Sequence, residues 1–137
     1  MLHDRLGYLL KHAQLALAER TAKALEPLDI NGRELAVLSV LGGGPPQAQQ
    51  QAAAQLSVDR TTMVDLIDAL EKKGLVERRS DPADRRRNLV HLTTTGRQTL
   101  TEGERLYREI ERSLLTEKEA DDLKRLLQRL LASTSES

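Results

Sequence analysis

The 137-residue chain contains no cysteine, tryptophan or phenylalanine, and Tyr8 and Tyr107 are its only tyrosines. The lack of thiols excludes a thiolate nucleophile, a cysteine redox switch and a cysteine zinc site. Proteins that bind single-stranded nucleic acid stack bases on aromatic rings, and two separated tyrosines are too few for such a platform. These absences exclude thiol chemistry and argue against single-strand binding.

Long apolar runs are also missing from the sequence. No run approaches the roughly 20 apolar residues that a membrane span requires. The first residues, Met1 to Asp4, include an acid and do not begin an apolar stretch of signal-peptide length. We therefore expect a cytoplasmic protein without a membrane partner, a compartment in which the absence of cysteine is unremarkable.

The length suits a single domain. The chain has 21 basic and 21 acidic residues, so its formal net charge is zero. That total conceals an uneven distribution, because residues 57–97 carry nine basic against seven acidic side chains and residues 98–137 carry seven against nine. The neutral total therefore does not exclude a polyanionic partner for the central segment.

The apolar residues are mostly leucine and alanine, which predicts a mainly α fold with at most one small sheet. Apolar positions at steps of three or four predict a helix over residues 2–25, ended by Pro27. Asn31 and Glu34 have the spacing of a capping box at the start of a second helix.

Two further helices are predicted after a Gly-Gly-Gly-Pro-Pro loop. The first covers residues 47–56, and the second covers residues 59–73 with Asp59 as its N-cap. Gly74 follows in the position where a left-handed residue commonly ends a helix.

The apolar period then changes to that of strands. Residues 75–79 and 88–92 predict a β-hairpin, joined by a turn at residues 80–84 and a block of three arginines. A helix from Thr94 and a final helix opened by a Thr-x-x-Glu capping box complete the chain, whose residues 133–137 are expected to fray.

Helix, tight turn, helix and hairpin is the element order of a winged helix-turn-helix. Inward-facing residues of the two helices are expected to be Ala53, Leu56, Val58, Met63 and Leu66. The outer face of the second helix then presents Arg60, Thr61, Thr62 and Asp65, near the end that a recognition helix offers to base edges in the major groove.

The predicted hairpin is strongly basic. Residues 78–97 contain six arginines against two aspartates. A narrow A·T-rich minor groove attracts inserted arginine, so Arg85, Arg86 and Arg87 are candidate minor-groove contacts. Asp84 is expected to hold the guanidinium of Arg86 by a charge-assisted hydrogen bond.

Residues 49–96 resemble the DNA-binding lobe of MarR-family transcriptional regulators. The resemblance rests on L-E-K-K-G-L-V-E-R-R from Leu70, D-P-x-D-R-R from Asp81 and L-T-x-x-G from Leu92. It implies a homodimer that reads a pseudo-palindromic operator in double-stranded DNA. It also matches Asp84 and Arg86 to the family's wing aspartate and minor-groove arginine.

The resemblance implies one MarR-like domain over residues 1–137, with dimerisation helices in 1–30 and 98–137 and a winged helix-turn-helix lobe in 31–97. Phosphate contacts are expected from Lys72, Arg78 and Arg79. Family members are commonly released from DNA by a small aromatic or lipophilic effector. On the resemblance, Tyr8, His12 and Arg33 are the candidate effector residues.

Other functions find little support in the residues. The carboxylates are dispersed without a catalytic arrangement, so we expect no enzyme and no cofactor. His3, His12 and His91 lack the spacing of a helical metal site. The alternative from another class is a winged-helix protein-interaction module whose basic wing binds an acidic protein. We expect a ligand-responsive repressor instead.

Overall fold

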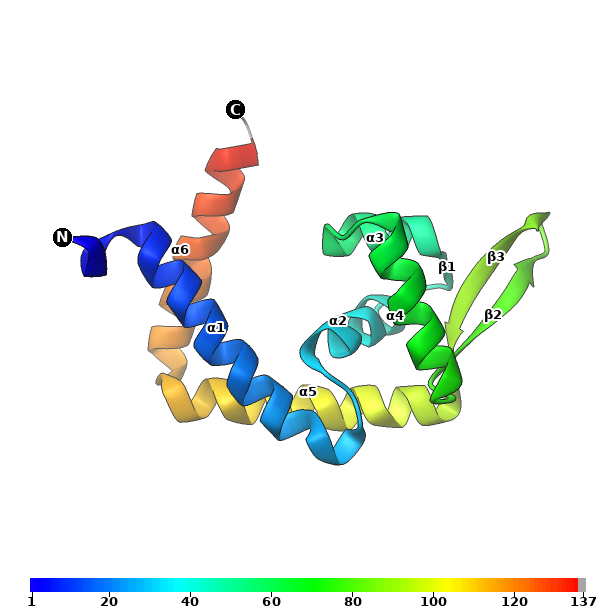
Figure 1. The fold of residues 1–137 in the computed structure, drawn as a ribbon, viewed down its shortest axis with the longest axis horizontal. Coiled ribbons are helices and arrows are strands. Elements are labelled where there is room, and N and C mark those ends of the chain that lie inside the picture. The colour runs from blue at the N-terminus through cyan, green and yellow to red at the C-terminus, as the bar shows by residue number, and fades with distance from the viewer. Residues whose placement is uncertain (136–137) are drawn as a thin grey trace.

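A long helix forms the base of the molecule, and two arms rise from its ends (Figure 1). The computed structural model describes residues 1–135. Its helices and strands are a 3-10 turn Leu2–Asp4, α1 Leu6–Leu25, a 3-10 turn Glu26–Leu28, α2 Gly32–Gly42, β1 Gln47–Ala48, α3 Gln49–Leu56, α4 Arg60–Lys72, β2 Val76–Asp81, β3 Asp84–Leu92, α5 Thr94–Leu114 and α6 Glu117–Ser135.

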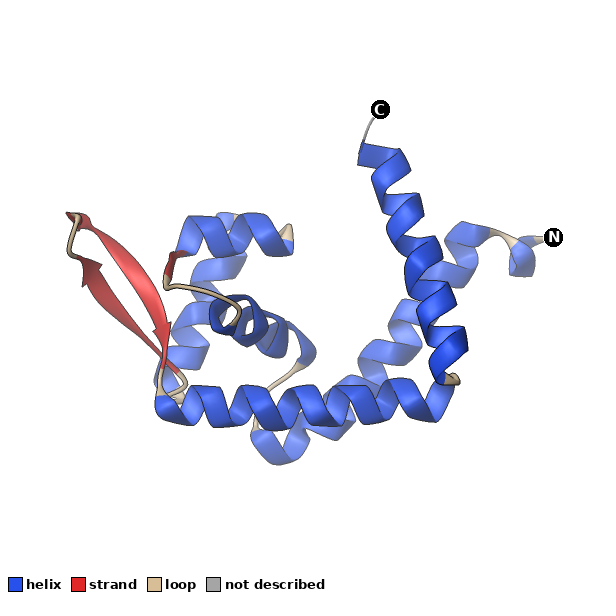
Figure 2. Ribbon diagram, turned by 180° about the vertical axis from the view of Figure 1, so that it is seen from behind, coloured by secondary structure: helices blue, strands red, loops and turns tan. Residues whose placement is uncertain are grey.

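The base helix is α5, which is contacted by both α1 and α2. One arm contains α2, α3, α4 and the sheet, and the other contains α6 and the first half of α1; Figure 2 shows the same division from behind. The sheet has the strand order β1-β3-β2, and both pairings are antiparallel. The mainly helical winged fold predicted from the sequence is confirmed.

The main core lies inside the arm that carries the sheet. Its largest fully buried side chains come from the end of α1 and from α2, α4, β2 and β3, and they are Leu25, Leu38, Met63, Ile67, Leu70, Val37, Val76 and Val90. Leu100 of α5 packs against this core. The base helix thus belongs to both arms. The predicted boundary between the DNA-binding lobe and the dimerisation helices, at residue 98, falls inside α5.

The L-T-x-x-G motif joins the wing to the base helix. Thr93 accepts a hydrogen bond from the Gly96 N–H (2.9 Å) and donates its hydroxyl to the Gly74 carbonyl (2.7 Å). The Leu75 carbonyl accepts from the Thr93 N–H at 3.1 Å. A Cβ built on Gly96 would overlap that carbonyl oxygen and lie 3.0 Å from the Leu75 carbonyl carbon. Glycine is required here because two backbones touch.

The predicted helix ends are confirmed. The Asn31 side chain accepts from the Glu34 N–H at 2.9 Å, and the Glu34 carboxylate accepts from the Asn31 N–H at 3.0 Å. Thr116 and Glu119 make the same reciprocal pair before α6. Gly74 has φ +74°, the left-handed conformation that a side chain would disfavour.

Some predicted boundaries were wrong. Residues 47–48 form strand β1 before α3 starts, because they pair with Val90 and Leu89. The wing turn is shorter than predicted, so residues 85–87 lie within β3 and not in a loop. Residues 2–4 form a separate 3-10 turn ahead of α1. Residues 133–135 continue α6, and the other two residues expected to fray lie outside the described residues.

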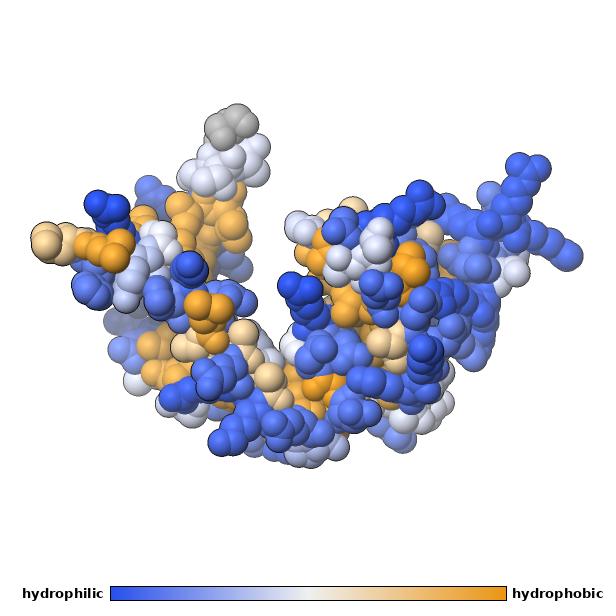
Figure 3. Space-filling view, viewed as in Figure 1, coloured by the Kyte–Doolittle hydropathy of each residue, from blue (hydrophilic) through white to orange (hydrophobic). Residues whose placement is uncertain are grey.

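The second arm exposes a large apolar surface. No described residue of α6 is buried, and Figure 3 shows hydrophobic side chains along this arm. The exposed leucines of α1 and α6 are Leu6, Leu9, Leu10, Leu15, Leu123, Leu126 and Leu131. No helix within residues 1–135 is long and apolar enough to cross a membrane.

Candidate DNA-binding surface

The turn between α3 and α4 has the tight geometry of a helix-turn-helix. Ser57 adopts φ +53°, and the Val58 N–H bonds back to the Ala53 carbonyl at 3.1 Å. This left-handed position often carries glycine, and serine occupies it here. Ala53 and Met63 are buried, while Leu56, Val58 and Leu66 pack against the core, as predicted.

Asp59 caps the first turn of α4. Its carboxylate accepts from the Thr62 N–H at 2.6 Å, as expected of an N-cap. That hydrogen bond from the Thr62 backbone lowers the pKa of Asp59 below its ordinary value of 3.8. The cap fixes the end of α4 that carries the predicted base contacts.

Acid should therefore weaken this cap. Because the folded-state pKa is lowered, its contribution to stability is present above pH 3.8 and is lost as the pH falls through the folded value. The Asp59→Asn variant keeps a capping oxygen that does not titrate. We expect unchanged stability at pH 7 and a shallower loss below pH 4, measured by urea unfolding. If the stability of Asp59→Asn fell as steeply below pH 4 as that of the wild type, this role would be contradicted.

The predicted recognition residues lie in the first two turns of α4. Arg60, Thr61 and Asp65 are exposed, and Thr62 is partly covered beside the cap. An aspartate at position 65 can accept from a cytosine or pair with Arg60. The ion pairs of the described residues do not include Asp65 with Arg60, so its carboxylate faces solvent.

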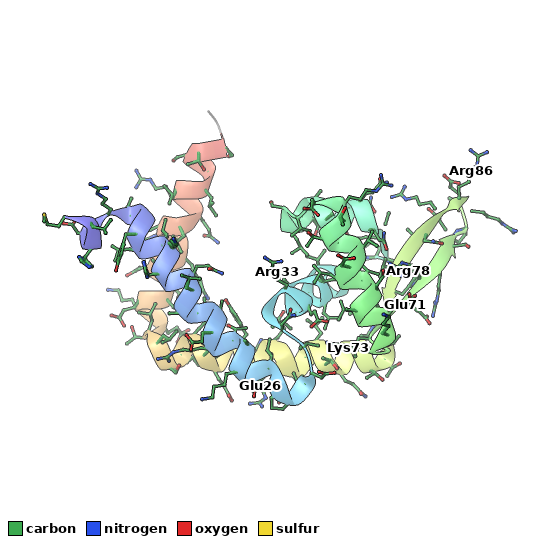
Figure 4. The ribbon with its side chains drawn as sticks, viewed as in Figure 1. Glu26, Arg33, Glu71, Lys73, Arg78 and Arg86 are labelled. Atoms are coloured by element: carbon green, nitrogen blue, oxygen red, sulfur yellow. The ribbon has the colours of Figure 1, made fainter. Side chains whose placement is uncertain are left out.

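The wing extends beyond the rest of this arm, with Arg86 near its tip and pointing outward (Figure 4). Asp84 does not hold the Arg86 guanidinium as expected; its carboxylate accepts from the Arg86 backbone N–H at 3.1 Å. Asp81 accepts in the same way from the Ala83 N–H at 2.9 Å. The two aspartates of the D-P-x-D motif therefore shape the turn, and the arginine side chain is left available.

A groove of about 560 Å³ separates the wing from the helix-turn-helix. Arg60 lines it from α4, Arg86 and Arg87 line it from β3, and Gln49 and Gln50 line it from α3. The structure thus brings the predicted recognition helix and wing together around one basic groove. The sequence offered no signal for the two glutamines, because strand β1, which sets the start of α3, was not predicted.

Arg78 also lines this groove, and its side chain is held by partners on two helices. Its guanidinium donates to Glu71 (2.7 Å) and Asp68 (2.7 Å) of α4 and to Gln49 (2.8 Å) of α3. The side chain is only 21% exposed, and Figure 4 shows Arg78 near Glu71 where the wing meets α4. This geometry makes Arg78 a fixed link between the wing and both helices, and its phosphate contact stays a prediction.

The other two predicted phosphate contacts are exposed. Lys72 lies in the last turn of α4. Arg79 is on β2 and pairs with Glu77 on the same strand. That pair is solvent-exposed and contributes little to stability, so a phosphate can replace Glu77 as the partner of Arg79.

Within one chain, the predicted effector residues lie in two places. Tyr8 and His12 contact each other near the start of α1, with ring centroids 4.1 Å apart. Arg33 lies instead in a second cavity of about 560 Å³ between α1, α2 and α5. The cavity is lined by Gln14, Leu17, Ala18, Thr21, Ala22, Asn31, Gly32, Arg33, Ala36 and Tyr107.

Sequence reasoning missed Tyr107 as a cavity residue. It lies more than seventy positions from Arg33, and its helical spacing suggested only a core position. Burial raises the pKa of Tyr107, and the negative charge of Glu111 adds to that effect. Its hydroxyl therefore stays protonated at neutral pH and can donate a hydrogen bond.

Two sequence comparisons relate this chain to known transcriptional regulators. The model of the MarR family matches residues 28–87. A putative transcriptional regulatory protein for the hcr operon of Thauera aromatica is 30% identical over 136 residues, which are 96% of this chain and 82% of that protein.

Solved structures match almost the whole chain. The transcriptional repressor CouR bound to a 23-mer DNA duplex is 34% identical, with a TM-score of 0.84, over 98% of this chain and 94% of that one. CouR from Rhodococcus jostii bound to p-coumaroyl-CoA is 27% identical, with a TM-score of 0.83, over 95% of this chain and 94% of that one. The chain therefore belongs to the MarR family of DNA-binding transcriptional regulators.

Proposed function

We propose that this protein is a cytoplasmic, homodimeric repressor without enzymatic activity, which binds a pseudo-palindromic operator and is released by a small anionic effector. The observation that carries the proposal is the basic groove formed by Arg60, Arg86 and Arg87 between α4 and the wing. The solved relative bound to a 23-mer DNA duplex matches 98% of this chain, which supports the proposal. A wing that binds an acidic protein is the less favoured alternative.

Each part of the DNA-binding surface has a separate task in the proposed complex. The start of α4 enters the major groove, where Thr61, Thr62 and Asp65 face base edges. Arg86 at the wing tip inserts into the adjacent minor groove. Lys72 and Arg79 bind phosphates, whereas Arg78 keeps the wing at a fixed angle to α4.

The proposed dimer is formed by the second arm. Exposed leucines of α1 and α6 give each chain an apolar surface that a second copy can cover. The dimerisation ranges 1–30 and 98–137 and the DNA-binding range 31–97 form part of this proposal. A two-fold axis would place two wings and two recognition helices on successive turns of the duplex.

Replacing Arg86 should weaken specific binding. We expect Arg86→Ala to lower operator affinity by about 1–3 kcal/mol, or roughly 5- to 150-fold, because an inserted arginine is lost from the minor groove. The measurement is a fluorescence anisotropy titration on the protein's own upstream intergenic DNA.

Lys72→Ala is the matched control for Arg86→Ala. It should lower affinity for all duplexes alike and reduce the slope of log affinity against log salt by about one, since one phosphate contact is lost. An Arg86 variant with wild-type operator affinity would overturn the assignment of the wing tip.

The cavity between α1, α2 and α5 is the proposed effector site. Arg33 supplies a cation for a carboxylate or phosphate, while Leu17, Ala18 and Ala36 supply an apolar wall. p-Coumaroyl-CoA and simple aromatic acids are suitable first probes, because a relative's structure contains the former.

An effector at 100 times its dissociation constant should stabilise the protein by about 2.7 kcal/mol. Arg33→Gln should abolish the resulting rise in Tm, and Tyr8→Ala should leave it unchanged. If none of these probes stabilises the wild type, the effector is not of this chemical class. If Tyr8→Ala removes the shift and Arg33→Gln does not, the site lies on the first half of α1.

A further inference from the structure

An ion pair behind the recognition helix joins it to the wall of the α1–α2–α5 cavity. Glu34 of α2 is 5% exposed, and Lys73 contacts both of its carboxylate oxygens, at 3.0 and 3.1 Å. Lys73 also donates to the Asp29 carbonyl at 2.5 Å. One ammonium group therefore ties the end of α4 to the α1–α2 connection. Figure 4 labels Lys73 at that end of α4.

On the α4 side, Lys73 stands at the junction of recognition helix and wing. It is the C-cap residue of α4, and its N–H bonds to the Ala69 carbonyl. Gly74 and Leu75 follow. The Gly74 carbonyl accepts a hydrogen bond from the Thr93 hydroxyl, and the Leu75 carbonyl accepts one from the Thr93 N–H. Any displacement of Lys73 would thus move the point about which α4 and the wing are oriented.

On the α2 side of the ion pair, Glu34 helps to hold the residues that line the α1–α2–α5 cavity. It forms the reciprocal capping box with Asn31, and Asn31, Gly32 and Arg33 all line the cavity. A ligand that contacts this rim must therefore act on the residues that hold the Glu34 carboxylate.

Breaking this ion pair is costly. A buried carboxylate is strongly destabilised when its charged partner is removed. Among the ion pairs of residues 1–135, Lys73 is the one cation paired with Glu34. The rim and the end of α4 should therefore move together and not separate.

We propose that the Glu34–Lys73 pair transmits movement of the cavity rim at residues 31–33 to the end of the recognition helix. Lys73 and Glu34 are positioning residues in this scheme and do not touch DNA. The inference rests on the proposed function for its biological meaning, but the mechanical coupling exists in the protein alone and can be tested there.

The test is amide hydrogen exchange on the full chain, with Asn31→Ala as the perturbation of the rim. Loss of this cap costs a helix about 1 kcal/mol, so exchange in the first turn of α2 should rise roughly fivefold. If the pair transmits the change, exchange at Lys73 and Leu75 should rise at least about twofold as well. No rise there would overturn the proposal.

The same perturbation is then made in variants of the pair. In Lys73→Met the rise at Leu75 should disappear, whereas in the matched control Lys72→Met it should persist. Because Lys73→Met leaves a buried charge, the double variant Glu34→Gln with Lys73→Met gives a neutral pair that retains the capping oxygen. Transmission that survives in the double variant would contradict the role of the ion pair.

A titration of the upstream DNA separates this inference from the proposed function. If the wild type binds no specific DNA but exchange is coupled, the regulatory role fails and the mechanical link stands. If the wild type binds and p-coumaroyl-CoA releases it, the double variant should still bind the probe but show at least about tenfold less release, a loss of 1.4 kcal/mol of coupling. Full release from the double variant would overturn transmission through the pair.

Discussion

The Leu126→Asp variant is expected to be monomeric and to lose operator binding. Leu126 is 54% exposed on α6, a helix with no buried residue in its described part. A two-fold axis would place two copies of the new carboxylate in the apolar interface, where charges without partners are costly. The monomer–dimer equilibrium can be measured by sedimentation at micromolar concentration.

Loss of the dimer should affect DNA binding more than any single contact. A dimer delivers its second DNA-binding lobe at a high effective concentration, which raises affinity by about 10²–10⁴-fold over one lobe. Leu126→Asp should lose that factor on an operator with two half-sites. Gln128→Asp, on the polar side of the same helix, should keep both the dimer and the affinity. A dimeric Leu126→Asp protein would place the interface elsewhere.

Gly96→Ala should destabilise the protein by about 3 kcal/mol or more, because the added methyl group overlaps backbone and not a movable side chain. The Leu75 carbonyl cannot retreat without breaking its hydrogen bond from the Thr93 N–H. Both the wing and the base helix are fixed at this junction, so DNA binding should fall together with stability.

Urea unfolding followed by circular dichroism provides the measurement. Gly44→Ala is the matched control, since a Cβ there meets nothing within 4 Å, and its stability should change by less than about 0.5 kcal/mol. Equal stabilities of the two variants would show that the chain can separate at Leu75 and that the L-T-x-x-G motif has another role.

The parts of the fold that the sequence predicted depend on local physics. Capping residues such as Asn31 and Asp59 bond to amides three positions away, so their spacing is visible in the chain. Strand β1 was missed because two residues have no period, and its pairing partners lie more than forty positions later. The short wing turn was missed because arginine is tolerated in an exposed strand as well as in a loop.

The candidate site shows the same division between local and distant contacts. The exposed positions of Arg60, Thr61 and Asp65 followed from helical periodicity. The role of Arg78 did not, because its partners are 7, 10 and 29 residues away. Tyr107 and Arg33 line one cavity only because α5 passes behind α2, and the order of elements along the chain does not specify this.

The central claim is that the basic groove and the second arm together make a dimer that recognises a particular duplex. The most direct measurement is the stoichiometry and affinity of binding to the protein's own upstream intergenic DNA, compared with a scrambled duplex of the same length and composition. We predict two chains per operator and at least about 10³-fold preference for the upstream duplex at physiological salt. Equal affinity for the two duplexes, from a protein shown to be dimeric, would contradict the account and favour an acidic protein as the partner of the wing.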